Sequence, residues 1–152
     1  KYLRGEATAL DGSQKAGLSL FIDKGCAACH GGTNLGGTMY QKFGVTGDPG
    51  PIYRPANDKG RGGVTGNAAE DYFFKVPTLR NIALTAPYFH TGSEPDLKKT
   101  IDVMAKVQMG QTLSATEIDQ IAAFLGSLTG DQPKVTVPNL PASDAKSPLP
   151  DK

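Results

Sequence analysis

The chain has 152 residues, a formal net charge of +1 and a hydrophobic content of 38%. This length predicts one domain, and the small net charge argues against nucleic acid or an anionic membrane surface as a partner. No apolar run approaches the roughly 20 residues of a membrane span.

The N-terminal part predicts a lead-in followed by one helix. Residues 1–12 suggest a linker remnant, and a helix is expected from about Ser13 to about Lys24. Its apolar residues Leu18, Phe21 and Ile22 follow the i, i+3, i+4 spacing of a helix face. Gly25 is expected to end this helix.

Directly after this helix comes the motif Cys26-Ala27-Ala28-Cys29-His30, which holds the only two cysteines of the chain. C-x-x-C-H is the attachment signature of a c-type haem. Two thiols at this spacing can each add across a haem vinyl group, and the histidine that follows can ligate the iron. The sequence therefore predicts one covalent haem c on Cys26 and Cys29, with His30 as an axial ligand.

Three other interpretations of the motif are weaker. A thioredoxin-like redox pair would need a βαβ pattern, which the sequence does not predict. A zinc site could add His90 to Cys26, Cys29 and His30, but two adjacent ligands strain a tetrahedral site. A Cys26–Cys29 disulfide would close a very small loop and contribute little stability.

The haem prediction carries an expectation about location. Covalent haem attachment implies assembly outside the cytoplasm, so we expect an exported, periplasmic protein. The chain opens at Lys1 without an initiator Met, which suggests a mature or excised product.

Residues 31–75 form a long stretch rich in Gly, Asp, Asn and Pro, which predicts loops and turns. A loop of this length is uncommon in a compact domain unless it is functional. Wrapping the edge of a haem would be such a function, and a mobile surface insertion is the alternative.

Two further helices are expected downstream of a short helix or turn around residues 79–84. The first begins near Ser93, with Asp96 as its capping-box partner. The second begins at the Ser114–Glu117 capping box and ends at Gly130. Residues 131–152 carry five prolines and predict an extended or disordered tail. The whole pattern favours an all-α, class I cytochrome c-like haem domain over residues 13–130, with a long Gly-rich loop and a Pro-rich tail.

The second axial ligand has four candidates: His90, Met39, Met104 and Met109. Met104 ends the apolar face of its helix, whereas Met109 is expected after the end of that helix. We favour Met104, although methionine is also a routine core residue. Ligation by Met and His raises the reduction potential and fills both axial positions, so such a haem transfers electrons instead of binding peroxide or oxygen.

At this point a family resemblance becomes specific. Residues 13–130 resemble the C-terminal half of the bacterial di-haem cytochrome c peroxidases, which carries their high-potential, electron-transferring haem. The resemblance rests on Asn34-Leu35-Gly36-Gly37, Val64-Thr65-Gly66, Phe74-Lys75-Val76-Pro77-Thr78-Leu79-Arg80-Asn81 and Leu84-Thr85-Ala86-Pro87-Tyr88-Phe89-His90-Thr91-Gly92.

The resemblance implies roles for several residues. Cys26 and Cys29 would hold the haem, and His30 and Met104 would ligate its iron; the related maturation enzymes of methylamine dehydrogenase place a Tyr at the Met104 position. A calcium ion lies between the two haem domains of the peroxidases, and the carbonyls of Thr85 and Pro87 would be its ligands here. From their position, Arg80 and Lys75 are candidate partners of a haem propionate, with solvated surface charge as the alternative.

One departure from the family sets the functional expectation. The peroxidases need a second C-x-x-C-H on an N-terminal domain where peroxide binds, and this chain has no other cysteine. We therefore expect the electron-transfer domain of a larger enzyme, with a stand-alone monohaem electron carrier as the alternative. A small redox donor, a cytochrome c or a cupredoxin, would supply electrons that pass to the peroxidatic haem, where hydrogen peroxide becomes water. The chain alone is not expected to be a competent peroxidase.

Overall fold

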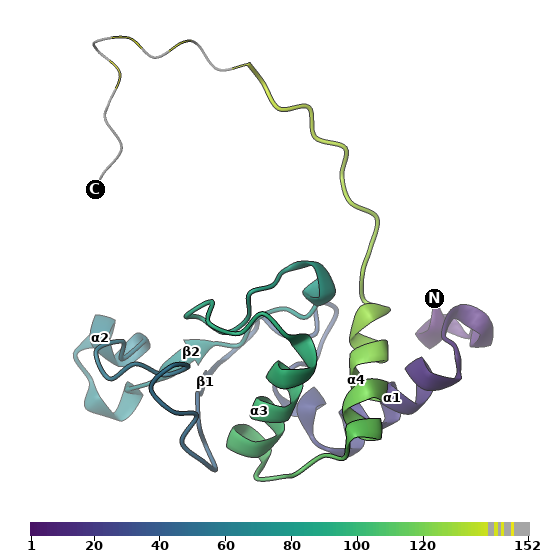
Figure 1. The fold of residues 1–152 in the computed structure, drawn as a ribbon, viewed down its shortest axis with the longest axis horizontal. Helices are drawn as coiled ribbons and strands as arrows, with labels where there is room; N and C mark the ends of the chain where they lie inside the picture. Colours follow the sequence, from purple (N-terminus) through teal and green to yellow (C-terminus); the bar gives the residue numbers. More distant parts are fainter. Residues whose placement is uncertain (140–141, 143, 145–146, 148–152) are drawn as a thin grey trace.

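The computed structural model describes residues 1–139, 142, 144 and 147. Helices dominate, which confirms the expected class I cytochrome c-like fold, and one small two-stranded sheet is added to it (Figure 1). None of the described helices is long and apolar enough to cross a lipid bilayer. The elements in chain order are η1 (Tyr2–Arg4), η2 (Ala7–Ala9), α1 (Gly12–Asp23), η3 (Cys26–Ala28), β1 (Tyr40–Lys42), α2 (Arg61–Thr65), η4 (Ala68–Glu70), β2 (Phe73–Lys75), η5 (Ile82–Leu84), α3 (Leu97–Met109) and α4 (Ala115–Gly126).

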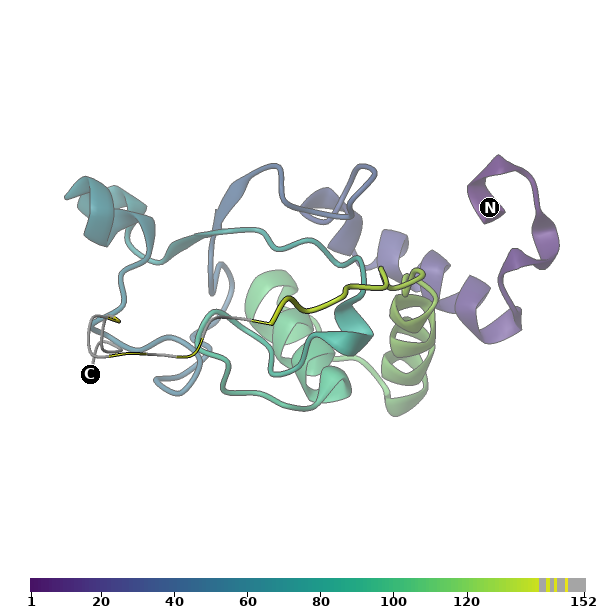
Figure 2. The same cartoon turned by 90° about the horizontal axis from the view of Figure 1, so that it is seen from above.

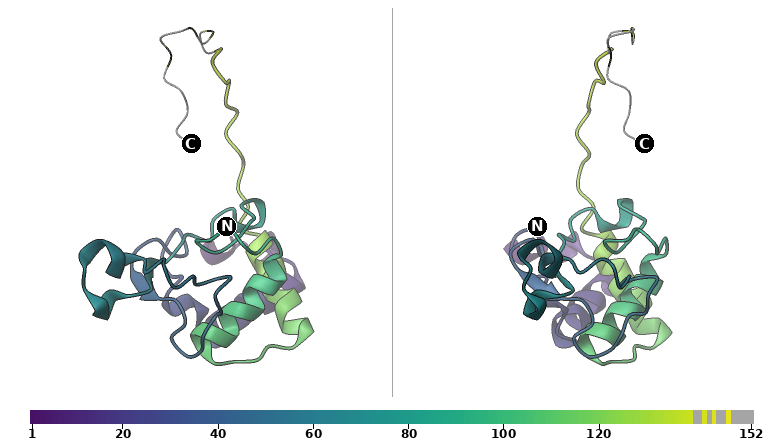
Figure 3. Two further views of the ribbon diagram at one scale, coloured as in Figure 1. Left: turned by 60° about the vertical axis from the view of Figure 1, so that its left-hand side comes forward. Right: turned by 90° about the vertical axis from the view of Figure 1, so that its left-hand side faces the viewer.

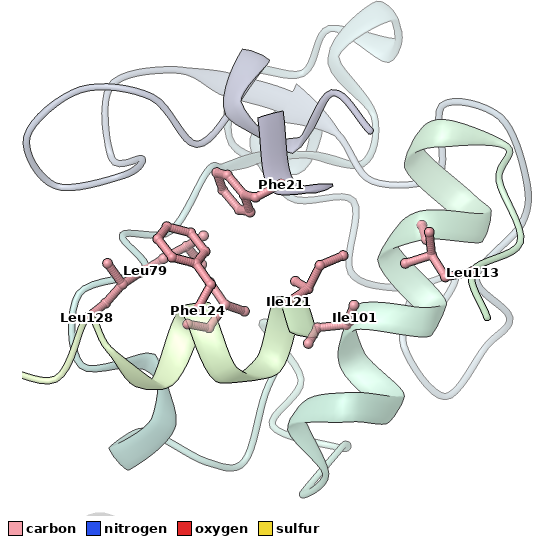
Figure 4. Close-up of a cluster of buried hydrophobic side chains, with 9 residues drawn as sticks. Phe21, Leu79, Ile101, Leu113, Ile121, Phe124 and Leu128 are labelled. Atoms are coloured by element: carbon pink, nitrogen blue, oxygen red, sulfur yellow. The ribbon is translucent and has the colours of Figure 1, made fainter. Parts of the chain in front are cut away.

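The first and last long helices, α1 and α4, pack against each other and bring the two ends of the domain together. A glycine lies at their contact: a Cβ on Gly17 would collide with the carbonyl oxygen of Gln120 and lie 2.9 Å from Cβ of Phe124. This close approach puts the Phe21 and Phe124 rings 5.3 Å apart (Figure 4). The core around this contact also includes Leu79, Ile101, Ala105, Leu113, Ile121, Leu125 and Leu128.

The Gly-rich stretch 31–75 is not a single open loop. Strands β1 and β2 pair antiparallel with Tyr40 opposite Lys75, and α2 and η4 lie between them in sequence. Helix α2 and η4 lie at the end of the molecule opposite the N-terminus (Figure 2). A second, smaller core of Phe43, Val103 and Val107 fastens it to α3.

Helix boundaries differ from the expectation in two places. The predicted start near Ser93 is wrong, because Asp96 is the N-cap of α3 and its side chain accepts hydrogen bonds from the Lys98 and Lys99 amides. Helix α3 also continues through Met109, so the expectation that Met109 follows the end of this helix is wrong.

Helix α4 starts as predicted and stops early. The Ser114–Glu117 capping box is present, but the helix ends at Gly126, ahead of Gly130. Beyond α4, residues 131–139 are exposed, have no regular secondary structure and lead away from the body of the molecule (Figure 3). Most of the remaining predicted tail lies outside the described residues.

Candidate haem-binding site

A cavity of about 430 Å³ lies between the α1–η3 junction, β2 with the segment after it, α3 and α4. This volume falls within the range of ligand and cofactor sites. Its walls are mainly apolar, with Phe21, Leu79, Ile101 and Leu125 among the lining side chains. The core therefore closes around a space instead of filling it.

The C-x-x-C-H motif lines this cavity. Gly25 adopts a left-handed conformation (φ 88°) after α1, which turns the chain into the short helix η3. The His30 amide then donates to the Cys26 carbonyl at 3.0 Å. Cys26 and Cys29 are both unpaired and half-buried, and burial raises the pKa of the Cys26 thiol. Two free thiols at the wall of an apolar cavity are what covalent haem attachment needs.

The His30 ring is oriented by backbone atoms. Its Nδ1 lies 3.3 Å from the Leu35 carbonyl oxygen, and burial lowers the pKa of the imidazole, which favours the neutral form. Gly36 leaves room for this arrangement, since a Cβ there would lie 3.2 Å from Nδ1. With Nδ1 held by a carbonyl, Nε2 is the nitrogen available to a metal.

Three of the four candidates for the second axial ligand line the cavity: Met104, Met109 and His90. Met39 is outside the lining and is 36% exposed. His90 has other partners, because its Nε2 lies 3.3 Å from Asp58 Oδ2 and its ring stacks on Phe74 at 3.8 Å. Desolvation lowers the pKa of His90, and the nearby Asp58 charge opposes that shift.

The two methionines of α3 occupy different parts of the cavity wall. Met109 packs beside Gly25, where a Cβ would lie 2.5 Å from the methionine methyl carbon. Met104 instead packs against the core of Phe43, Val103 and Val107. The choice of Met104 as the ligand stays a prediction.

The remaining predicted site residues divide into two groups. Lys75, Thr85 and Pro87 line the cavity. Arg80 does not, and its guanidinium donates from Nε and Nη2 to the Thr33 carbonyl oxygen, at 3.0 and 2.8 Å. Sequence reasoning missed Gln108, which also lines the cavity. Its only sequence signal is the spacing of four residues from Met104, which places both on one helix face.

The alternatives to haem find no support in this geometry. Within residues 1–139, 142, 144 and 147, no three His, Cys, Asp or Glu side chains are grouped so that they could hold a metal ion. The same part of the chain contains no parallel strand pair of a βαβ unit and no disulfide. An apolar cavity with two thiols and an oriented imidazole fits a covalently bound haem.

Comparison with known proteins agrees with this fit. The model of the family described as "Cytochrome c" matches residues 14–129. The chain belongs to the cytochrome c family. Membership implies a covalently bound haem c and an electron-transfer role for this cytochrome c domain.

The resemblance to cytochrome c peroxidases is also confirmed. The chain is 47% identical to cytochrome c551 peroxidase of Pseudomonas aeruginosa and 44% identical to that of Nitrosomonas europaea, over 98% and 97% of its own length. It spans only 43% of each of these curated relatives. A solved structure described as a MauG-like protein associated with microbial copper homeostasis is 28% identical, with a TM-score of 0.67 over 84% of this chain and 46% of that one.

Proposed function

We propose that this cytochrome c domain is the electron-input unit of a di-haem cytochrome c peroxidase. It would accept electrons from a small redox donor, a cytochrome c or a cupredoxin, in the periplasm. The electrons would pass to a peroxidatic haem in an N-terminal domain that reduces hydrogen peroxide to water. Small redox encounters of this kind bury little surface and dissociate quickly.

One observation carries the proposal: the same apolar cavity is lined by Cys26, Cys29 and His30 from one short segment and by Met104 from helix α3. When bound, a single haem c would supply a one-electron Fe(III)/Fe(II) couple. The chain's own residues would hold it: the Leu35 carbonyl orients the His30 ring, and the apolar wall would exclude water from the group. Occupation of both axial positions by protein side chains would leave no site for peroxide.

The end of η5 and the residues that follow it support a role for a neighbouring domain. Residues 83–87 are exposed, and Leu84 is 57% exposed although it is a large apolar side chain. The carbonyl oxygens of Thr85 and Pro87 in this segment are hard ligands of the kind that calcium prefers. We propose that they bind a calcium ion at the interface with the N-terminal domain.

The test uses the haem-loaded chain in a peroxide assay with a reduced donor. We expect reversible oxidation and reduction of the haem, without meaningful peroxidase turnover. Robust turnover by this chain alone would contradict the proposal. A stand-alone electron carrier is the alternative, and the coding sequence upstream of Lys1 distinguishes the two, because the proposal requires a second C-x-x-C-H there.

A further inference from the structure

The Gln108 side chain makes three hydrogen bonds to one distant segment of the backbone. Its Oε1 accepts from the Gly44 amide at 2.6 Å and from the Val45 amide at 3.1 Å. Its Nε2 donates to the Lys42 carbonyl at 2.9 Å. These partners are 63 to 66 residues away in sequence, so this one amide joins α3 to the chain that follows β1.

The segment held in this way, residues 42–47, is called the strap here. Its C-terminal end is fixed to the same stretch of α3, because the Thr46 and Gly47 amides donate to the Val107 carbonyl at 2.9 and 3.3 Å. The Thr46 hydroxyl also donates to the Lys106 carbonyl at 3.0 Å. The strap therefore lies across the last turns of α3.

The strap brings one aromatic side chain against the predicted axial ligand. Phe43 is 7% exposed and forms a core with Val103 and Val107, and Met104 packs against that core. Phe43 also lines the cavity. A shift of the strap would therefore move a wall of the space in which the Met104 thioether lies.

We propose that Gln108 is a positioning residue that holds the strap so that Phe43 fixes the Met104 side chain for ligation of the haem iron. The inference rests on the proposed function, because it takes Met104 as the ligand. Removal of the amide leaves the Gly44 and Val45 N–H groups and the Lys42 carbonyl without their partner, and each lost partner weakens the attachment of the strap.

The test compares the haem-loaded wild type with Gln108→Leu, which keeps an apolar stem of similar size and removes all three hydrogen bonds. Hydrogen exchange at the Gly44 and Val45 amides reports the strap, and the Met–iron charge-transfer band and the reduction potential report the ligand. Gln120→Leu is the matched control, since Gln120 is on α4 and outside the cavity lining. Gln108→Glu is the second variant, because its carboxylate can still accept from both amides.

We expect Gln108→Leu to speed exchange at both amides about tenfold or more, equivalent to about 1.4 kcal/mol. The charge-transfer band should weaken and the potential should fall, since Met ligation raises it. Gln108→Glu should retain slow exchange and the band, and Gln120→Leu should match the wild type.

Two results would overturn the role of Gln108 alone: unchanged exchange in Gln108→Leu, or faster exchange with an unchanged band and potential. If Gln108→Leu does not fold, Gln108→Glu decides the question, because its carboxylate can still accept hydrogen bonds from the Gly44 and Val45 amides. Fast exchange of these amides together with loss of the charge-transfer band in Gln108→Glu would then count against the role of Gln108. A wild type without the band would instead refute Met104 ligation, which belongs to the proposed function.

Discussion

Met104 and Met109 of helix α3 line the same cavity, but their side chains point in different directions from the helix axis. Five residues of α-helix turn the chain by about 500°, so their side chains lie about 140° apart around the axis of α3. Met104 contacts the Phe43 core, whereas Met109 lies beside Gly25 at the cysteine side. A single iron in the cavity could therefore be ligated by only one of the two methionines, and the other would make only packing contacts.

Replacement of Met104 by Ala is expected to abolish the Met–iron charge-transfer band of the oxidised protein and to lower its reduction potential, because the thioether is lost. Met39→Ala is the matched control, since Met39 is partly exposed and outside the cavity lining. Absorption spectra and redox titration check both variants. A band that survives in Met104→Ala and vanishes in Met109→Ala would move the ligand to Met109.

The sequence could identify some site residues because their signal is local. Cys26, Cys29 and His30 lie within five residues, and their spacing alone predicts covalent haem attachment. The role of Gln108 could not be found in this way, because its partners belong to the strap more than 60 residues away. For Arg80 the sequence showed only a charge near lining residues, and the bond to the Thr33 carbonyl depends on a loop fold that no pattern predicts.

At the scale of elements, the packing of α1 on α4 depends on one missing side chain. Gly17→Ala should lower the free energy of unfolding by about 1–3 kcal/mol, because the new methyl group collides with the Gln120 carbonyl. This figure is the net loss that remains after the gain of about 1 kcal/mol in helix propensity has been subtracted. Denaturant unfolding measures it, and Gly126→Ala, which meets open space at the end of α4, should be neutral or stabilising. Equal stability of the two variants would contradict the tight crossing.

Glu117 links the start of α4 to the end of α1. The Lys24 ammonium 2.7 Å away, together with hydrogen bonds from the Ser114 amide and hydroxyl, lowers the pKa of Glu117 to about 2 from its usual 4.5. Since the pKa is lower in the folded protein, the ionised carboxylate stabilises the fold above pH 4.5, and this contribution is lost as the pH falls towards 2.

Glu117→Gln should therefore be less stable than the wild type at pH 7, and the gap should narrow between pH 4.5 and about 2. Denaturant midpoints across this pH range provide the measurement, with Glu6→Gln in the exposed lead-in as the background. A gap that stays constant from pH 7 to 2 would show that the carboxylate charge has no part in the effect.

The same capping box explains why the start of α4 could be predicted from the sequence, whereas its end and the start of α3 could not. Ser114 and Glu117 form a capping box within four residues, and this local signal marks the start of α4. Ser93 resembles an N-cap residue in the sequence, but its hydroxyl donates to the Ile52 carbonyl instead. Strands β1 and β2 have three residues each and pair across more than 30 residues of chain, so neither carries a periodic signal of its own.

At the scale of the whole molecule, the apolar core residues line a large cavity instead of packing fully against one another. No large side chain of the described residues is less than 2% exposed, and the cavity measures about 430 Å³. Without a haem, the apolar side chains that line this cavity would be exposed to water, which weakens the packing between the elements that carry them. A typical domain has a total stability of only about 5–15 kcal/mol, so the fold is sensitive to this loss of apolar burial.

The chain produced without haem attachment should therefore lack fixed tertiary packing. We expect loss of the near-UV circular dichroism signal, binding of a hydrophobic dye and a broad thermal transition, while helical far-UV signal persists. The haem-loaded chain is the reference. A sharp, cooperative transition of the haem-free chain would show that the walls collapse onto each other at little cost.

The lining of the cavity runs from Phe21 to Leu125, and so spans nearly the whole folded chain. The motif at residues 26–30 lies near the start of this span, and most of the other lining residues follow it in the sequence. A haem attached at this motif would therefore contact side chains from most of the later elements of the fold. We expect haem attachment to be coupled to the folding of this domain, because the attached group would provide the surface on which segments far apart in the sequence pack.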